Sequence, residues 1–401
     1  MRKGEGILVV DVGTTKITAL MGEEREGALW ITGLGISSSQ GLKRGCIVNI
    51  DEATLSIKNA VEKAITQAKI EPTYLFTSIA GSHIKTYSGM GVIALKEREV
   101  TQQDVEEVLQ SAQAVDLPAN KLILHVIPQE FIVDQNKGIL QPVGMVGVRL
   151  EAHVQLVTAE KAHIQNLLRC FENIGLEVDG VIFQGLASAE AVLTPEEKEL
   201  GVLLIDLGGG TSDLVIYKEG VLRYASSLPL GGDLFTGDLA ICLRTTRAEA
   251  EKLKIEKGVC LRELVSEEEF IEVPGIGNRP SARINRKILA EILEERAKEL
   301  LNLIKAEIKN FTPTYLISGA VLTGGTSLIP GLIYLTDQIL DLPARIGYPE
   351  RLPGLTEEVY HPQFATAVGM LLYTYNNLVS TIEKAPKKKG ILMRIREFLR
   401  I

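Results

Sequence analysis

Two short segments of the same pattern, about two hundred residues apart, constrain the fold of this chain most strongly. The first is Ile7–Lys16 (ILVVDVGTTK), and the second is Val202–Asp213 (VLLIDLGGGTSD). Each begins with an apolar run that has the length and β-branched character of a buried strand. Each then places an Asp at the strand end, followed by Gly and hydroxyl residues. The pattern predicts two strand-and-turn hairpins of one kind.

The residue types in these turns suit the binding of a polyphosphate. Glycine allows a positive φ and lets backbone N–H groups approach an anion closely. Thr and Ser hydroxyls can donate hydrogen bonds to phosphate oxygens, and an Asp can hold Mg²⁺ directly or through water. Either segment alone could be an ordinary strand-end turn. Two of them facing each other would clamp a nucleotide from both sides.

Two common nucleotide motifs are absent from the sequence. No G-x-x-x-x-G-K-S/T occurs, so there is no P-loop. The Gly33–Gly35 segment fails as a dinucleotide fingerprint because Ser38 replaces the third glycine of G-x-G-x-x-G.

A third glycine segment, Ile317–Ser327 (ISGAVLTGGTS), again predicts a strand that runs into a tight turn. Paired glycines suit close approach to a base or a sugar. Two phosphate segments followed by a glycine-rich adenosine segment resemble the actin, Hsp70 and sugar-kinase superfamily. Within it the chain is similar, nearly end to end, to the FtsA family of bacterial actin-like cell-division proteins. The specific matches are Leu124–Glu130 (LHVIPQE), Gly185–Glu190 (GLASAE), the Gly231–Gly232 pair and a basic amphipathic C-terminus.

The resemblance implies an α/β, two-lobed actin-like ATPase fold. A small α+β subdomain is inserted in the first lobe, and an amphipathic helix is expected at the C-terminus. The length of the chain agrees with a two-lobed fold, because 401 residues are more than a single hydrophobic core usually contains. The expected divisions are the first lobe core (1A) at 1–83, 161–199 and, as a C-terminal helix, 359–382; the insertion (1C) at 84–160; the second lobe core (2A) at 200–228 and 306–358; its outer subdomain (2B) at 229–305; and a linker with a membrane-targeting helix at 383–401.

Local patterns support several helices. Polar and apolar spacing predicts helices at 52–69, after Thr101, at 162–174, at 186–193, at 288–308 and from Phe364 onward. Asp51 is expected to cap the first of these.

The composition argues against several other classes of protein. The four cysteines are scattered without a C-x-x-C, and the five histidines are dispersed. We therefore expect neither a disulfide framework nor a zinc or histidine metal site. No apolar run approaches the roughly 18 residues of a membrane span, and no signal peptide is expected.

Charge is unevenly distributed. The net charge is −8, yet residues 384–401 carry seven basic residues and one acidic residue, so the rest of the chain carries −14. An acidic body is a poor nucleic-acid surface, and we expect no nucleic-acid partner.

The resemblance also assigns site residues. Asp11 and Asp206 are expected to face Mg²⁺. The residues expected to cradle the phosphates of ATP are Gly13, Thr14, Thr15, Lys16, Gly208, Gly209, Gly210 and Thr211. The remaining nucleotide contacts are expected from Asp213, Gly231, Gly232, Glu251, Lys254, Gly324, Gly325 and Thr326.

Alternatives stay open for several of these residues. Lys16 could be a solvated surface lysine, Asp213 could cap a turn, and Glu251 with Lys254 could belong to a charged helix face. Hydrolysis needs a group that orients water. Gln184 lies where related ATPases place such a group, so Gln184 and Asp206 are the candidate catalytic residues, with slow or vestigial turnover expected.

The C-terminal segment predicts a membrane-surface helix. At 100° per residue five of its apolar side chains fall within an arc of about 120°, whereas Met393 and Ile401 lie outside it. The predicted membrane residues are Ile391, Leu392, Ile395, Phe398, Leu399 and the cationic Lys387, Lys388 and Lys389. A cation near an anionic leaflet contributes about 1 kcal/mol. The alternative is a terminal helix docked on the protein's own core.

A second basic segment lies in the predicted outer subdomain. By resemblance this region receives the acidic C-terminal peptide of the tubulin-like FtsZ, and a solvated face is the alternative. The candidate partner residues are Arg283, Arg286, Lys287 and Arg296.

Together these features predict a peripheral protein on the cytoplasmic face of the cell membrane at the division septum. It would bind ATP and Mg²⁺, polymerise into filaments, tether the FtsZ ring and recruit later division proteins. The nearest alternative is a type IV pilus assembly ATPase of the PilM kind, against which the amphipathic tail argues. A sugar or acetate kinase would need a small-substrate pocket with a catalytic base, and an Hsp70-type chaperone would need a substrate-binding domain.

Overall fold

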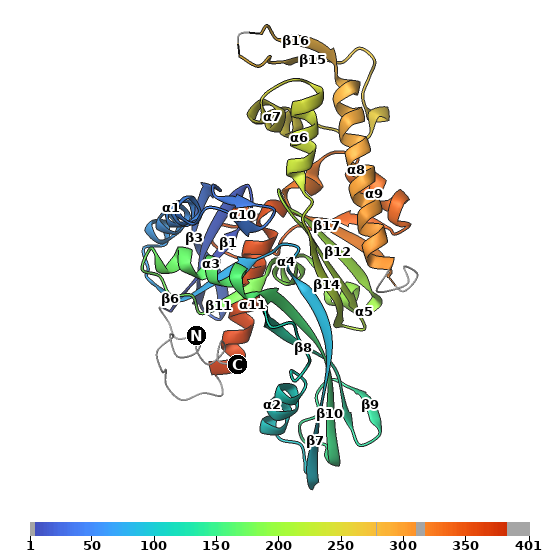
Figure 1. Ribbon diagram of the computed structural model, residues 1–401. Coiled ribbons are helices and arrows are strands. Elements are labelled where there is room, and N and C mark those ends of the chain that lie inside the picture. The colour runs from blue at the N-terminus through green and yellow to red at the C-terminus, as the bar shows by residue number, and fades with distance from the viewer. Residues whose placement is uncertain (1–4, 278, 310–316, 383–401) are drawn as a thin grey trace.

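The computed structural model describes residues 5–277, 279–309 and 317–382 of the chain. Two lobes each contain a five-stranded sheet, and smaller elements extend from both (Figure 1). The two-lobed α/β architecture with an inserted subdomain is therefore confirmed.

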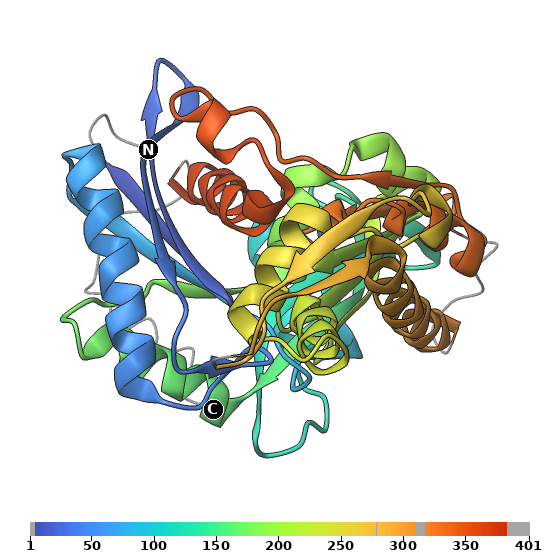
Figure 2. The ribbon, with the colours of Figure 1, turned by 90° about the horizontal axis from the view of Figure 1, so that it is seen from above.

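The first-lobe sheet has the order β11-β6-β1-β2-β3. Strand β1 pairs antiparallel with β2 and parallel with β6, and β11 adds in parallel beside β6. All seven residues of β1 are buried, as expected of a central strand covered on both faces. Figure 2 shows helices α1 and α11 on opposite sides of this sheet. The bounds are β1 Gly6–Val12, β2 Lys16–Arg25, β3 Ala28–Ser38, β6 Pro72–Ile79, β11 Gly180–Phe183, α1 Ile50–Ala68 and α11 Ala365–Ile382.

The second-lobe sheet repeats this topology in the order β14-β13-β12-β17-β18. Its central strand β12 also pairs antiparallel with the next strand and parallel with a later one. The six residues of β12 are buried. The bounds are β12 Val202–Leu207, β13 Ser212–Lys218, β14 Val221–Leu228, β17 Gly319–Thr323 and β18 Ala344–Ile346.

The inserted subdomain is a four-stranded sheet, β7-β10-β8-β9, covered by helix α2. It leaves the first-lobe sheet after β6, returns before α3, and has a hydrophobic core of its own (Figure 1). The bounds are β7 Lys85–Glu99, α2 Gln102–Ser111, β8 Lys121–Val133, β9 Asn136–Ile139 and β10 Val146–Glu160.

Helices α6, α7 and α8 and the β15–β16 hairpin form the outer part of the second lobe (Figure 1). Helix α8 packs its apolar side chains, including Leu293 and Leu300, into the second-lobe core. The bounds are α6 Gly232–Cys242, α7 Arg247–Lys257, β15 Phe270–Val273, β16 Ala282–Asn285 and α8 Arg286–Lys309.

The remaining short elements connect these layers. Helix α4 is the most important, because its side chains reach both lobes, as described below. The bounds are β4 Leu42–Lys43, β5 Cys46–Ile47, α3 Lys161–Glu172, α4 Gln184–Val192, α5 Pro195–Leu200, η1 Arg262–Leu264, η3 Gly325–Leu328, α9 Leu332–Leu340, α10 Thr356–Val359 and η4 Pro362–Phe364.

One predicted cap is wrong. Helix α1 is capped by Asn49, whose side chain accepts hydrogen bonds from the N–H groups of Asp51 and Glu52. Asp51 instead lies in the first turn, where its charge favours the positive end of the helix dipole. Within the described ranges, none of the helices combines the length and the apolarity that a bilayer crossing requires.

Candidate functional site

A cleft of about 490 Å³ opens between the hairpins of the two lobes. Both turns contribute to its lining, together with α4, α7 and the segment after β17. The predicted site residues that line it are Asp11, Gly13, Thr14, Thr15, Lys16, Gln184, Asp206, Gly208, Gly209, Thr211, Asp213, Glu251, Lys254, Gly324, Gly325 and Thr326.

The two hairpin turns have the same backbone geometry. The Gly13 N–H donates to the Lys16 carbonyl oxygen at 3.1 Å, and the Gly208 N–H donates to the Thr211 carbonyl oxygen at 3.0 Å. Each turn therefore closes over four residues and carries its Asp two positions before the glycine.

The tips of the two turns touch each other. A Cβ on Gly209 would lie 2.3 Å from Thr15 Cγ2, and one on Gly210 would lie 2.4 Å from Thr14 Oγ1. Glycine is thus required at these positions by the opposing threonines. Gly210 is not among the residues that line the cleft and packs against Thr14 instead, so its phosphate contact stays a prediction.

Asp11 lies buried at the end of β1, where two side chains fix it. Ser78 Oγ donates to its Oδ1 at 2.9 Å, and Gln184 Nε2 donates to the same oxygen at 3.1 Å. Burial raises the pKa of Asp11 to about 6, against the opposing effects of the Ser78 hydrogen bond and the nearby Lys16 charge. A buried carboxylate of this kind favours a cation beside it.

Asp206 is the corresponding residue of the second lobe. Its Oδ2 accepts hydrogen bonds from Ser188 Oγ and, at 3.1 Å, from Thr366 Oγ1. Burial raises its pKa. Gln184 and Ser188 lie one turn apart on α4, so one face of this helix holds Asp11 with one side chain and Asp206 with the other.

Asp213 pairs with Asp206 across β12 and β13. It is buried, its Oδ1 has no hydrogen-bond partner in the part of the chain that the structure describes, and burial raises its pKa well above the usual value. The turn-capping alternative does not account for this unpaired oxygen. Three buried carboxylates on one cleft fit a hard divalent cation such as Mg²⁺, whose preferred ligands are oxygens.

Lys16 extends into the cleft. Its Nζ donates to the Gln363 carbonyl oxygen at 3.0 Å and lies 4.0 Å from the centre of the Phe364 ring. Burial lowers its pKa to about 8, while Asp11 and Asp206 oppose that change. This environment differs from that of a solvated surface lysine and places a cation where phosphate oxygens could bind.

Lys254 is buried on α7 rather than displayed on a charged helix face. Its Nζ donates to the Gly232 carbonyl oxygen at 3.2 Å and forms an ion pair with Glu251 at 2.7 Å. Gly231 and Gly232 are not among the residues that line the cleft, and their contact with a nucleotide stays a prediction. A Cβ on Gly231 would lie 2.5 Å from the Gly209 carbonyl oxygen, so this glycine pair supports the second turn from behind.

The sequence analysis missed several lining residues. Leu328, Ile329 and Pro330 directly follow the third glycine segment, and this position could have identified them as an apolar wall. No recognisable pattern marks the others, which are Ile255, His361, Pro362, Gln363 and Thr366.

The predicted partner residues lie on the outer part of the second lobe, and three of them already have acidic neighbours. Arg286 pairs with Glu269 at 2.6 Å. Lys287 pairs with Glu267, and Arg296 pairs with both Asp238 and Glu299. Arg283 stacks over the Phe270 ring at 4.7 Å. The predicted membrane residues at 387–399 lie outside the described residues.

Solved structures with the same fold share little sequence with this chain. The PilM–PilN type IV pilus biogenesis complex matches with a TM-score of 0.66 and 16% identity, covering 93% of this chain and 99% of that one. MreB5 of Spiroplasma citri bound to ADP matches with a TM-score of 0.58 and 14% identity, covering 96% of this chain and 100% of that one. These likenesses establish an actin-like fold.

Sequence relatives are much more similar. Cell division protein FtsA of Pseudomonas aeruginosa is 42% identical over 375 residues, which cover 93% of this chain and 90% of the relative. Cell division protein FtsA of Escherichia coli is 37% identical, with 92% and 90% covered. Residues 203–369 match the family described as cell division protein FtsA, and residues 81–158 match the SHS2 domain inserted in FtsA. The chain belongs to the FtsA family of cell division proteins.

Proposed function

We propose that this protein binds ATP with Mg²⁺ between its lobes and works in cell division as a filament-forming tether between FtsZ and the cytoplasmic membrane. One observation carries the nucleotide part of the proposal. Three buried carboxylates, Asp11, Asp206 and Asp213, and the cation of Lys16 meet on a single cleft of about 490 Å³.

In this proposal the lining residues have separate roles. Lys16 and the turn N–H groups bind the phosphates, and the carboxylates hold Mg²⁺ directly or through water. Gly324, Gly325 and Thr326 lie beside the adenosine with Glu251 and Lys254. The metal would neutralise phosphate charge.

Gln184 has a positioning role in this proposal. Its amide donates to Asp11, to the Val12 carbonyl oxygen at 3.3 Å and to Ser78 Oγ at 2.9 Å. An amide engaged in this way fixes a carboxylate and would orient water only after rearranging. This supports slow turnover of bound ATP.

The nucleotide proposal is tested by calorimetry on Asp206→Ala. We expect ATP–Mg²⁺ affinity to fall strongly, because the variant lacks a buried metal ligand. Asp337→Ala, at an exposed position of α9, is the matched control and should bind like the unchanged protein. Equal affinity in all three proteins would refute the clamp.

Self-association is proposed from the actin-like fold. The solved MamK structure, a double helical filament, matches this chain with a TM-score of 0.53. Pelleting of the purified chain with ATP and Mg²⁺, compared with chelator, would test assembly. The same experiment is repeated with anionic vesicles present. If the protein stays in the supernatant with ATP and Mg²⁺ as well as with chelator, the filament proposal is wrong.

Membrane attachment is proposed from the apolar arc that contains Ile395 and Phe398 and from the cations Lys387–Lys389. Phe398→Glu places a carboxylate in that arc, where the lipid interface would have to desolvate it. Flotation with anionic vesicles should fall sharply in this variant and survive in the conservative Phe398→Leu. If the unchanged protein does not float, or if Phe398→Glu floats equally well, the proposal of a membrane-binding tail is wrong.

Binding of an acidic FtsZ peptide is proposed for the β15–β16 face. Since Arg286, Lys287 and Arg296 have acidic partners, Arg283 is the most informative position. Arg283→Glu should weaken peptide binding in fluorescence anisotropy, and salt should weaken it in the unchanged protein. Arg149→Glu on the inserted sheet is the control. Equal affinities would place the peptide elsewhere.

A further inference from the structure

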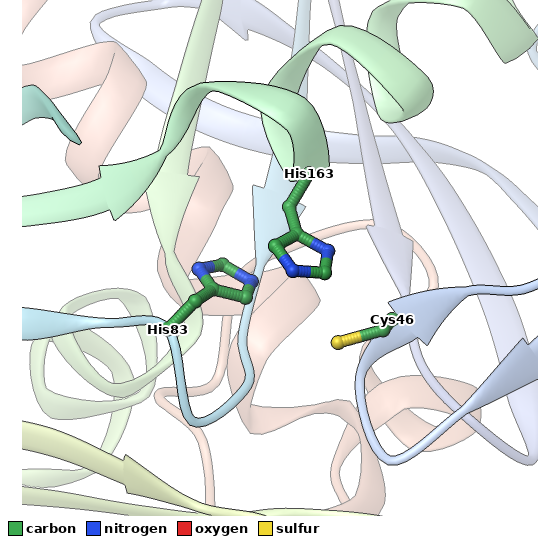
Figure 3. Close-up of side chains that lie close together, drawn as sticks. All are labelled: Cys46, His83 and His163. Carbon is green, nitrogen blue, oxygen red and sulfur yellow. The ribbon is translucent and has the colours of Figure 1, made fainter. Parts of the chain in front are cut away.

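Three residues that are distant in sequence meet where the inserted sheet joins the first lobe. Cys46 comes from β5, His83 from the connection between β6 and β7, and His163 from α3. Figure 3 shows the Cys46 sulfur directed toward the two imidazole rings. The possible ligand atoms all lie within 4.8 Å of one another, and the rings stack with centroids 4.2 Å apart.

His83 is an unusual member of this cluster. Only 5% of its surface is exposed, and neither ring nitrogen has a hydrogen-bond partner among the described residues. The Ala80 backbone lies near enough to favour protonation slightly, but no hydrogen bond of normal geometry forms. Buried polar atoms are nearly always satisfied, so two unsatisfied nitrogens on one ring need an explanation.

Charged side chains of both signs lie beside the cluster, since the Lys121 Nζ donates to the His83 carbonyl oxygen at 2.6 Å and the Glu160 carboxylate lies next to His163. Glu160 Oε2 lies 3.9 Å from His163 Nε2, and Lys121 lies 3.8 Å from the other Glu160 oxygen. Burial and the Glu160 charge raise the pKa of the Cys46 thiol.

We propose that Cys46, His83 and His163 form a binding site for a borderline divalent cation of the Zn²⁺ class, with the Glu160 carboxylate or a water as the fourth ligand. One sulfur and two imidazole nitrogens are a donor set that Zn²⁺ binds in tetrahedral geometry. Such geometry places ligand atoms about 3.3–3.7 Å apart, so the side chains would close by roughly 1 Å. Because a metal lies in the plane of each imidazole that binds it, the two rings, now 10° from parallel, would also turn away from their stacked arrangement. Binding releases the thiol proton to solvent as the thiolate–metal bond forms.

The position gives such an ion a structural role. His83 and His163 flank the two chain connections of the inserted sheet, and Cys46 belongs to the first lobe. The neighbouring Gly45 N–H donates to Thr14 Oγ1 at 2.9 Å, and the Gly81 N–H donates to Ser227 Oγ of the second lobe at 2.9 Å. The ion would fix the insertion to the first lobe beside both hairpins.

The test is titration of the full chain, stripped of metal and kept in excess Mg²⁺, with Zn²⁺ against a chromophoric chelator. We expect one Zn²⁺ per chain. Cys46→Ser and His163→Gln should each lower the affinity for Zn²⁺ by more than roughly tenfold, which is the loss expected when only a supporting contact to a ligand is removed. The controls Cys242→Ser, at an exposed cysteine, and His153→Gln, on β10, should bind normally.

A second measurement does not depend on how the variants fold. Co²⁺ added to the unchanged protein should produce thiolate-to-metal charge-transfer absorption and tetrahedral ligand-field bands. The proposal is overturned if Co²⁺ gives no thiolate band, if Zn²⁺ does not bind stoichiometrically, or if folded Cys46→Ser and His163→Gln bind Zn²⁺ as tightly as the unchanged protein.

Discussion

The β1–β2 hairpin and the β12–β13 hairpin have turns of the same backbone geometry but different charges. Their turns close with equivalent hydrogen bonds, and each places one Asp beside the cleft. At the position where the first turn has Lys16, the second has Thr211. Where the first pairs Asp11 with Thr18, the second pairs Asp206 with Asp213. The first hairpin thus balances its carboxylate with an ammonium, whereas the second carries two carboxylates.

This difference indicates a division of roles within a repeated topology. The first hairpin supplies a cation that suits phosphate oxygens, and the second supplies oxygen ligands that need a cation of their own. Helix α4 connects them, since Gln184 holds Asp11 and Ser188 holds Asp206. A repeated fold can therefore build a two-sided site by changing few side chains.

The largest predicted effect concerns the cost of burying Asp11. Its pKa of about 6 lies above the usual aspartate value of 3.8, so the folded protein binds the proton more tightly than the unfolded chain does. The contribution of this group to stability is full below pH 3.8 and is lost as pH rises through 6, by about 3 kcal/mol. Asp11→Asn avoids the loss and should stabilise the nucleotide-free protein at pH 7.5, though not at pH 4.

Urea unfolding in chelator at both pH values measures this effect, with Asp337→Asn at an exposed position as the control. Equal stability of Asp11→Asn and the unchanged protein at pH 7.5 would show that the first hairpin carries no buried-charge penalty.

The contact between the two turns gives the next effect. Gly210→Ala would bring a Cβ within 2.4 Å of Thr14 Oγ1, and such overpacking costs about 1–3 kcal/mol. Thr14→Gly removes the opposing side chain at the cost of the Gly45 hydrogen bond, so the double variant should be more stable than the sum of the two single losses predicts. Thermal melting of the two single variants and the double variant measures the coupling. Additive effects would mean that the tips do not touch.

The smallest predicted effect is a difference in the number of protons released when ATP–Mg²⁺ binds. Burial raises the pKa of Asp213 well above its usual value, and a Mg²⁺ ion beside the carboxylate would lower that pKa and displace any proton bound there. Binding of ATP–Mg²⁺ at pH 7 should release up to about one proton, and less in Asp213→Asn. Calorimetry in buffers of different ionisation enthalpy measures the release. If both proteins release the same number of protons, Asp213 does not contribute to Mg²⁺ binding.

The hairpins could be predicted from sequence because their information is local. An apolar run, an Asp and a glycine turn lie within a dozen residues or so, and the fold and most lining residues follow from them. The role of Gly210 could not be predicted, since a glycine does not reveal what approaches it, and here Thr14 does. Ser188 lies in a segment that marked the resemblance, yet nothing local shows that it contacts Asp206.

Tertiary contacts explain the other differences. Dispersed histidines argued against a histidine metal site, but the two connections of the insertion bring His83 and His163 together beside Cys46. The basic segment appeared cationic in sequence, whereas the fold pairs Arg286 with Glu269. Sequence spacing carries no information about either contact.

The central claim is that the first hairpin serves the phosphates and the second serves the metal. ATP affinity measured with Mg²⁺ and with chelator, for the unchanged protein, Lys16→Met and Asp206→Asn, tests it most directly. Lys16→Met should weaken binding under both conditions by roughly tenfold or more and keep the enhancement by Mg²⁺. Asp206→Asn should lose that enhancement while binding metal-free ATP at least as well. If each variant changes the ATP affinity by the same factor with Mg²⁺ and with chelator, the two hairpins do not have separate roles and the central claim is wrong.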